Sequence, residues 1–439
     1  MIGRLSLMTI VGLFSVLLVF SIGSSVADAG DISRCDTIDV PGYYYLTENI
    51  TAGFGTCIEI TSSDVTLDGR GYWIFAGDNV AIEISKIWGT LENVTIKNLN
   101  IRGGTSSTNG KNGIELFNVN NGRIENCTIS YVGTGIDMAK SNNSILVGNT
   151  IHNTSSYGVY MSQSHNNVIS DNTIQNAQFD GDGISMSDSD NNVISDNTIH
   201  NTSNYGVRMI RSHNNVISDN TIQNAQFDGI FMSNSDNNTL IDNIIHDNGN
   251  PGLYLFSSNN NYIANNTIQR NKWYGVRIYS SAENVFENNR ITENCGEMAG
   301  VYIIYSSNQM FVSNNVSNNT GHGFWVVGSS NISITNSSVS WNNWDGFFID
   351  YSEYITIFNS EIIGNGMNGI NVFEGDTYQN FSDNVIRNNG MCGISLSSEI
   401  LSTIINNFIY NNSYSGLCLF GSSNNLIYNN YFNNTENVI

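Results

Sequence analysis

The sequence predicts an all-β protein folded as a single-stranded right-handed parallel β-helix, with coils of about 23 residues. One observation is a nearly verbatim repeat, in which the run beginning at Tyr157 returns 48 residues later at Tyr205, with a looser copy between them. Another is a glycine followed by an apolar, any and apolar residue, which recurs every 22 to 25 residues from Gly113 to Gly416. A fixed period in this range is typical of a solenoid whose units stack on one another.

Each unit is interpreted as strands and turns. Gly183-Ile184-Ser185-Met186 alternates with period two, which favours a strand, and Ala, Glu, Lys and Leu are too sparse for a helix in every repeat. The recurring Ile-x-x-Asn-x-Ile resembles part of a leucine-rich repeat, but the rest of the unit is rich in Gly, Ser and Asn, as turns are. The unit length suits three short strands and three turns.

Two further columns keep step with the glycines. A serine follows most of them by six residues and an asparagine by fourteen, as in Ser164 and Asn172 after Gly158. Stacked coils lie roughly 4.8 Å apart, so equivalent residues should lie directly above one another. We expect Asn and Ser to pass hydrogen bonds along the stack. Each glycine should mark a bend that needs either a positive φ or a close backbone approach.

Along the chain, residues 1–29 are predicted to be a secretory signal, with a charged start and an apolar run. Residues 30–102 should form an N-terminal cap and the first coils. Residues 103–439 should form regular coils that end without a capping segment, and residues 30–439 one domain. Cys35 and Cys57 flank one short segment and are predicted to form a disulfide worth on the order of 3 kcal/mol.

The other four cysteines give no pairing from the sequence, because Cys127, Cys295, Cys392 and Cys418 fall in no matching columns. No Cys/His spacing indicates a zinc site. The formal charge of −22 argues against nucleic acid and anionic membrane surfaces as partners. Asn-x-Ser/Thr sequons recur, which fits a secreted surface.

The side chain two residues after each glycine should point outward and form a vertical column. In the middle and later coils that column is Arg208, Phe231, Tyr254, Arg277, Tyr302, Trp325 and Phe348. A contiguous exposed apolar face usually marks a binding site, and rings with interleaved arginines suit sugar rings and uronate carboxylates. A purely stabilising cross-strand aromatic ladder and a protein-binding face are the alternatives.

Two polar columns contain residue types that can bind metal ions. Four carboxylates recur at coil spacing and could hold Ca²⁺, or form hydrated acidic turns: Asp171, Asp196, Asp219 and Asp242. A second column alternates histidine and aspartate: His165, Asp190, His213 and Asp236. We interpret the second column as hydrogen-bonded turns rather than a copper or zinc site, and the sequence indicates no other cofactor.

The chain resembles the archaeal and bacterial NosD-like proteins, within the larger group of pectate-lyase-like right-handed β-helices with carbohydrate-binding and sugar-hydrolase relatives. The resemblance rests on the Cys35…Cys57 segment with Pro41-Gly42-Tyr43, on residues 65–71, and on the repeated Asn-x-Ile-x-x-Asn with Gly-Ile-x-Met. It covers about residues 33–435. It implies the fold and an assignment as a surface protein, and named members assist copper-site assembly in a periplasmic reductase. The C-terminal segment usual in that family is missing here.

Catalytic signatures are sparse. A two-residue insertion brings Asp180 and Asp182, which could serve acid–base chemistry, and Arg208, Arg211 and Arg277 are the mid-chain arginines near carboxylates. The chain lacks the combined Asp-Asp, Gly-His-Gly and Arg-x-Lys set of β-helical polygalacturonases and the Asp-Pro-His-Asp of mannuronan epimerases.

The sequence therefore favours a secreted or cell-surface β-helix that binds a polysaccharide or surface glycan without turning it over. Any membrane association would come from tethering outside the visible sequence. The alternatives are a polysaccharide lyase or glycoside hydrolase, a structural or adhesion protein that meets a surface protein, and a NosD-like copper-assembly accessory.

Overall fold

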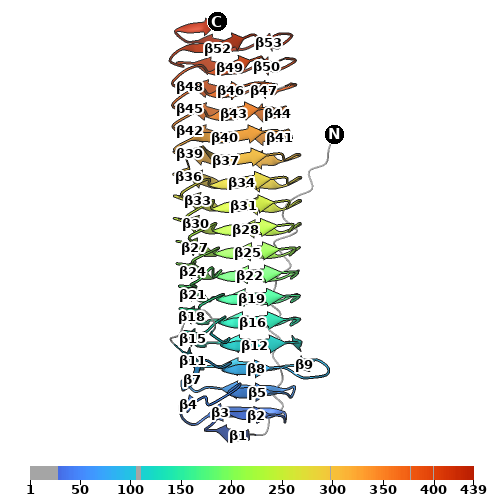
Figure 1. The fold of residues 1–439 in the computed structure, drawn as a ribbon. Helices are drawn as coiled ribbons and strands as arrows, with labels where there is room; N and C mark the ends of the chain where they lie inside the picture. The colour runs from blue at the N-terminus through green and yellow to red at the C-terminus, as the bar shows by residue number, and fades with distance from the viewer. Residues whose placement is uncertain (1–27, 105–109, 297, 376, 399) are drawn as a thin grey trace.

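A computed structural model describes residues 28–104, 110–296, 298–375, 377–398 and 400–439. The chain winds into a rod of about 17 turns of about 23 residues, with successive strands stacked in parallel from one end to the other (Figure 1). Each coil contributes one strand to each of three sheets, which we name A, B and C, in the order B, A, C. The predicted signal segment lies almost wholly outside the described residues.

Sheet B contains β2 (Asp36–Ile38), β5 (Ile58–Ile60), β8 (Ile82–Ile84), β12 (Ile114–Phe117), β16 (Ile136–Ala139), β19 (Val159–Ser162), β22 (Ile184–Ser187), β25 (Val207–Ile210), β28 (Ile230–Ser233), β31 (Leu253–Phe256), β34 (Val276–Tyr279), β37 (Ala299–Ile304), β40 (His322–Val327), β43 (Phe347–Asp350), β46 (Ile370–Val372), β49 (Ile394–Ser397), β52 (Ser415–Phe420) and β55 (Glu436–Val438).

Sheet A contains β1 (Asp28–Ile32), β3 (Gly42–Leu46), β6 (Val65–Asp68), β10 (Thr95–Lys97), β14 (Arg123–Glu125), β17 (Ile145–Val147), β20 (Val168–Ser170), β23 (Val193–Ser195), β26 (Val216–Ser218), β29 (Thr239–Ile241), β32 (Tyr262–Ala264), β35 (Val285–Glu287), β38 (Met310–Val312), β41 (Ser330–Thr335), β44 (Glu353–Phe358), β47 (Asn380–Ser382), β50 (Thr403–Ile405) and β53 (Leu426–Tyr428).

Sheet C contains β4 (Ile50–Thr51), β7 (Trp73–Gly77), β11 (Asn100–Gly103), β15 (Thr128–Ser130), β18 (Thr150–His152), β21 (Thr173–Gln175), β24 (Thr198–His200), β27 (Thr221–Gln223), β30 (Ile244–His246), β33 (Thr267–Gln269), β36 (Arg290–Thr292), β39 (Asn315–Ser317), β42 (Ser338–Ser340), β45 (Glu361–Ile363), β48 (Val385–Arg387), β51 (Phe408–Tyr410) and β54 (Tyr431–Asn433). A small extra sheet pairs β9 (Leu91–Glu92) with β13 (Val119–Asn120), where a loop leaves the rod in its lower part (Figure 1).

The core is a continuous rod of apolar side chains, because alternate residues of every strand point inward. Ile184 and Met186 of β22 are fully buried, and the same inward positions recur in the coils above and below. Toward the C-terminal half, phenylalanines join the aliphatic stacks, with the rings of Phe286 and Phe311 4.6 Å apart. Across the part of the chain that the structure describes, no helix is long and apolar enough to cross a membrane.

The recurring glycines are required by close packing rather than by a positive φ, which settles the alternative left open by the sequence. None of the fourteen from Gly113 to Gly416 has a positive φ. A Cβ on Gly158 would lie 2.3 Å from Cγ2 of Ile174 and 2.5 Å from the carbonyl oxygen of Gly183 in the next coil. A larger residue would therefore force the backbone of adjacent coils apart at this bend.

The predicted Ser and Asn ladders are confirmed. The Nδ2 of Asn197 donates to Oδ1 of Asn220 over 3.0 Å, and the Nδ2 of Asn220 donates to Oδ1 of Asn243 over 3.0 Å. The backbone N–H of Ser164 donates to Oγ of Ser189 over 3.1 Å. Two further asparagine ladders stand at the other corners, through Asn215 and through Asn271, and the sequence columns did not predict them.

Two disulfides fasten neighbouring coils. Cys35 is joined to Cys57, the pair expected from the sequence. Cys392 is joined to Cys418, so leaving these two unpaired was wrong. They occupy different positions in their coils, Cys392 directly before Gly393 and Cys418 two residues after Gly416, and both are buried where these positions of adjacent coils meet.

The asparagine ladder should contribute measurably to the free energy of unfolding. In Asn220→Ala, the backbone N–H and Nδ2 of Asn197 lose their buried acceptor, and the Ile194 carbonyl and Asn243 Oδ1 lose the Asn220 Nδ2 donor. We expect the free energy of unfolding to fall by about 2–4 kcal/mol, which a urea denaturation curve would measure as a shift of its midpoint. The control is Gln223→Ala, because the side chain of Gln223 is half-exposed on the outer side of sheet C, and it should shift the midpoint little. Equal effects of the two substitutions would contradict this role for the ladder.

Candidate functional site

The predicted outward column exists in register along sheet B. Arg208 pairs with Phe231, Phe231 with Tyr254, and Tyr254 with Arg277, each as Cα partners on adjacent strands. The column continues in the same register through Tyr302, Trp325 and Phe348. All seven side chains are half-buried. We call this column of seven residues the aromatic strip.

Ring contacts hold the strip together along the rod. The ring centroids of Phe231 and Tyr254 lie 5.3 Å apart, and those of Tyr302 and Trp325 lie 4.7 Å apart. The guanidinium carbon of Arg277 lies 4.6 Å from the ring centroid of Tyr254, a cation–π contact. The strip therefore presents flat apolar surfaces with positive charge between them.

A second column borders the strip and was not predicted. It consists of the residue directly before each glycine from Gly158 to Gly369, and we call it the edge column: Tyr157, Asp182, Tyr205, Asp228, Pro251, Tyr274, Ala299, His322, Asp345 and Asn368. Its side chains lie against the strip. The ring of Tyr205 stacks on Phe231 with centroids 5.0 Å apart, and Tyr274 stacks on Tyr302 at 4.9 Å.

Asp182 is a buried carboxylate in the edge column. Its Oδ1 accepts a hydrogen bond from the backbone N–H of Tyr205 over 3.3 Å, and its Oδ2 lies 4.0 Å from a terminal nitrogen of Arg208 without a hydrogen-bond partner. Burial raises the pKa of Asp182 to about 6, and hydrogen bonds from Ser185 and the Tyr205 backbone together with the charge of Arg208 oppose this rise.

Asp228 lies two coils further along the same column and is more isolated. It is 3 % exposed, and its Oδ1 has no hydrogen-bond partner. Burial raises the pKa of Asp228 to about 8, and the positive charge of Arg277 only partly offsets this. The two carboxyl groups therefore differ in protonation near neutral pH, with Asp182 largely ionised and Asp228 largely protonated.

A third polar group completes the edge column toward the C-terminus. The Nδ1 of His322 lies 3.4 Å from Oδ2 of Asp345, and the backbone N–H of Asp345 points at the same Nδ1 over 3.3 Å. The Oδ1 of Asp345 accepts hydrogen bonds from the backbone N–H and Nδ2 of Asn368. His322 stacks on Phe348 with ring centroids 4.9 Å apart, so this network also lies against the strip.

A hollow opens beside the strip, at Tyr274 and Cys295. It has a volume of about 380 Å³ and is lined by Lys272, Trp273, Tyr274, Cys295, Gly296 and Met298. Tyr274 belongs both to this hollow and to the edge column. The hollow therefore lies next to the stacked rings of Tyr274 and Tyr302.

The four aspartates considered for calcium are turn residues. Asp171, Asp196, Asp219 and Asp242 are exposed, and each has a φ of 56° or 57°. The equivalent residues of other coils are Asn126, Gly148 and Asn265, which share this left-handed conformation. Asn, Asp and Gly tolerate it best, so backbone geometry accounts for the column. Among the described residues, no group of three or more His, Cys, Asp or Glu is placed to hold a metal ion.

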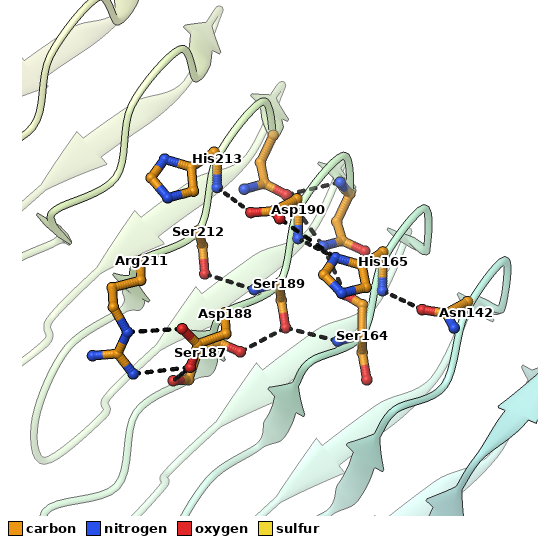
Figure 2. Close-up of polar contacts among 12 residues, drawn as sticks. Asn142, Ser164, His165, Ser187, Asp188, Ser189, Asp190, Arg211, Ser212 and His213 are labelled. Carbon is orange, nitrogen blue, oxygen red and sulfur yellow. Dashed lines mark hydrogen bonds and ion pairs between the residues drawn. The ribbon is translucent and has the colours of Figure 1, made fainter.

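The alternating His–Asp column forms a hydrogen-bonded corner, visible in Figure 2. The backbone N–H of Asp190 donates to Nδ1 of His165 over 3.0 Å, and the backbone N–H of His213 donates to Oδ1 of Asp190 over 2.7 Å. Because Nδ1 accepts, the proton of each neutral imidazole lies on Nε2. Nearby, Arg211 makes two hydrogen bonds with the carboxylate of Asp188 in the adjacent coil. These groups act as rungs between coils.

Two family models together match most of the chain. The model described as "Periplasmic copper-binding protein (NosD)" matches residues 57–212 and 91–267, and the model described as "Right handed beta helix region" matches residues 229–384 and 375–438. The chain belongs to the right-handed β-helix proteins, and its first half is NosD-like. No curated protein sequence matches this NosD-like chain at a significant level.

Several solved structures are similar to it at low identity. The A-module of mannuronan C-5 epimerase AlgE6 from Azotobacter vinelandii is 14 % identical over 89 % of this chain and 91 % of that chain, with a TM-score of 0.47. The DFA-IIIase from Arthrobacter chlorophenolicus A6 is 11 % identical over 59 % and 81 %, with a TM-score of 0.46. The periplasmic alginate epimerase AlgG is 15 % identical over 87 % and 77 %, with a TM-score of 0.37. At such identities the likeness concerns the fold alone.

The residues of this NosD-like chain do not fit a copper centre. Cys127 is buried, and burial raises the pKa of its thiol to about 12, so it stays protonated and is a poor metal ligand. His152, His200 and His246 lie two coils apart on sheet C, with Gln175 and Gln223 between them. Across the described residues no group of three or more His, Cys, Asp or Glu side chains converges on one point.

The burial of Asp228 predicts a pH dependence of stability. Its pKa is raised from about 3.9 in the unfolded chain, so the folded state binds the proton more tightly, and this stabilisation is lost as the pH rises from about 4 to about 8. In Asp228→Asn, this loss is absent.

We therefore expect the melting temperature of Asp228→Asn, measured relative to the wild type, to increase by about 5 °C between pH 5 and pH 9. Asp171→Asn, which removes an exposed carboxylate, is the matched control and should show no such change. Parallel pH profiles for Asp228→Asn and the wild type would refute the assignment.

Proposed function

We propose that this protein binds a polysaccharide or glycan along the aromatic strip. The observation that carries the proposal is the register of seven half-exposed rings and guanidinium groups on adjacent strands of sheet B. Sugar rings pack their apolar faces on flat aromatic side chains, and an extended glycan can follow a linear row of rings. Arg208 and Arg277 add donors suited to carboxylate or sulfate groups.

The polar edge column supports binding over a purely stabilising ladder. A ladder that only held the sheet together would need no buried carboxylates beside it, since burying an unpaired acid costs stability. Asp182 and Asp228 are nevertheless buried there, each with an oxygen that lacks a hydrogen-bond partner. Such convergent polar groups next to apolar rings are the usual composition of a ligand site.

We also propose an extracytoplasmic location. The two disulfides, Cys35–Cys57 and Cys392–Cys418, form readily where the environment is oxidising. The matching family is described as periplasmic, and the apolar N-terminal segment agrees with export. The strip would then face polysaccharides outside the cytoplasm.

A glycan array probed with the purified chain should identify bound polysaccharides. Affinity for the best of these should fall about tenfold or more for each of Tyr302→Ala and Trp325→Ala, because each removes roughly 1.4 kcal/mol of ring burial. The matched control is Tyr354→Ala plus Tyr378→Ala, which removes a stacked pair, 5.1 Å apart, between neighbouring coils away from the strip. Unchanged affinity in the strip variants, or equal losses in the control, would count against the proposal.

A further inference from the structure

The acceptor sequences for N-linked oligosaccharides fall on two of the three sheets. Fifteen asparagines, from Asn49 to Asn433, begin an Asn-x-Ser/Thr sequon. Twelve of them are exposed, and the other three, Asn142, Asn153 and Asn380, are half-buried. None lies in a strand of sheet B, because all of them belong to the strands of sheets A and C or to the turns beside them.

The repeat keeps these sequons apart from the buried ladders. The ladder residue Asn266 donates through Nδ2 to Oδ1 of Asn289 over 3.0 Å, and it begins no sequon because the second residue after it is the buried Ile268. Asn265, directly before it, is exposed in a left-handed turn with a φ of 55°, and Thr267 supplies the hydroxyl on the outer side of sheet C. An oligosaccharide on Asn265 therefore leaves the ladder hydrogen bonds in place.

Two acceptors have an exposed aromatic residue at the equivalent position of the next coil. Tyr354 follows Asn331 in the register of β41 and β44, and Trp341 follows Asn318 directly after the paired strands β39 and β42. The two rings are 51 % and 59 % exposed. Their φ angles of 58° and 57° are left-handed, a conformation that bulky residues rarely adopt. Backbone geometry therefore does not account for these rings.

Each of these rings has one covered face. Tyr354 stacks in parallel on Tyr378 of the following coil, with ring centroids 5.1 Å apart, so its other face is turned toward the coil of Asn331. Trp341 lies over Gly364 of the following coil, where a Cβ would come within 2.6 Å of the ring. Since coils are roughly 4.8 Å apart, a sugar joined to the preceding acceptor reaches the open face. Sugar rings pack well on such faces.

We propose that the sequon asparagines of sheets A and C carry N-linked oligosaccharides, and that the first sugars on Asn331 and Asn318 pack on Tyr354 and Trp341. This inference rests on the proposed extracytoplasmic location and goes beyond binding at the aromatic strip, because here the sugar is a covalent part of the protein. The oligosaccharides would coat two sides of the rod and leave sheet B, with its strip, bare for a ligand.

The attachment balances with a lipid-linked oligosaccharide phosphate as the co-reactant, brought by a transferase. The Nδ2 of the asparagine bonds to the anomeric carbon of the first sugar. The bond between that carbon and the phosphate oxygen breaks, the lipid phosphate leaves with the electron pair, and the amide gives one proton to a base. One N–H remains on Nδ2, so the hydrogen bond from Asn331 to Oδ1 of Asn308, 2.6 Å long, persists.

The test isolates the full chain from outside the cells that produce it and maps its glycopeptides by mass spectrometry. We expect oligosaccharide on Asn318 and Asn331 and none on any residue of a sheet B strand. Ser333→Ala removes the hydroxyl residue of the Asn331 sequon and should abolish modification of Asn331 alone. Ser333→Thr, the matched control, keeps the sequon and should keep the oligosaccharide. Residue 333 is half-exposed on the outer side of sheet A, so both changes spare the core.

Oxidation by hydroxyl radicals, followed in the same peptides, tests the packing of sugar on ring. The oxidation rate of Tyr354 should rise about twofold or more in Ser333→Ala, because loss of the sugar uncovers one face of the ring. It should stay at the wild-type value in Ser333→Thr.

The outcomes that contradict the inference are distinct. An exported chain with no oligosaccharide on any asparagine overturns it and leaves the proposed binding along the strip intact. Oligosaccharide within sheet B strands overturns the bare face. Equal Tyr354 oxidation in Ser333→Ala and a modified wild type overturns the packing on the ring. A chain found only in the cytoplasm overturns the extracytoplasmic location and this inference together.

Discussion

The vertical register of the coils is the constraint on which every other feature depends. Each buried asparagine of a ladder accepts hydrogen bonds from one neighbouring coil through Oδ1 and donates to others through Nδ2, as Asn220 does. A coil displaced sideways or rotated by one residue would leave these amides buried without partners and would turn the apolar side chains outward. The ladders and the apolar rod therefore fix the same alignment independently.

Register also explains how a surface of this kind can arise. The side chains two residues after each glycine are aligned and point away from the core. A single substitution per coil can therefore lengthen the strip or change its chemical character without disturbing the core. The edge column borders the strip and directly precedes the glycines, where neighbouring coils approach so closely that a Cβ would clash. That close packing is what buries Asp182 and Asp228, and burial shifts the pKa of both carboxyl groups upward.

The regular spacing of residues along the sequence predicted the fold and the strip, but it did not predict the edge column or the second disulfide. Glycine, serine and asparagine columns repeat the same letters, and Tyr254 or Trp325 could be placed by their offset from a glycine. The edge column mixes Tyr, Asp, Pro, Ala, His and Asn, so no single residue type recurs in every coil to reveal it. Cys392 directly precedes Gly393 and Cys418 lies two residues after Gly416, so their disulfide joins two different positions of the repeat, and comparison of equivalent positions cannot find it. The aspartate column, by contrast, repeats because its turn needs a residue that tolerates a positive φ.

Distances between spin labels along one outward column test the register most directly. Ser170, Ser218 and Thr335 lie in one column of sheet A, two coils apart from first to second and five from second to third. In a Cys295→Ser background, label pairs at 218 and 335 and at 170 and 335 should give distances of about 24 Å and about 34 Å, an increase of roughly 4.8 Å per coil. Distances that do not grow in proportion to the number of coils would contradict the stacked arrangement and with it the strip.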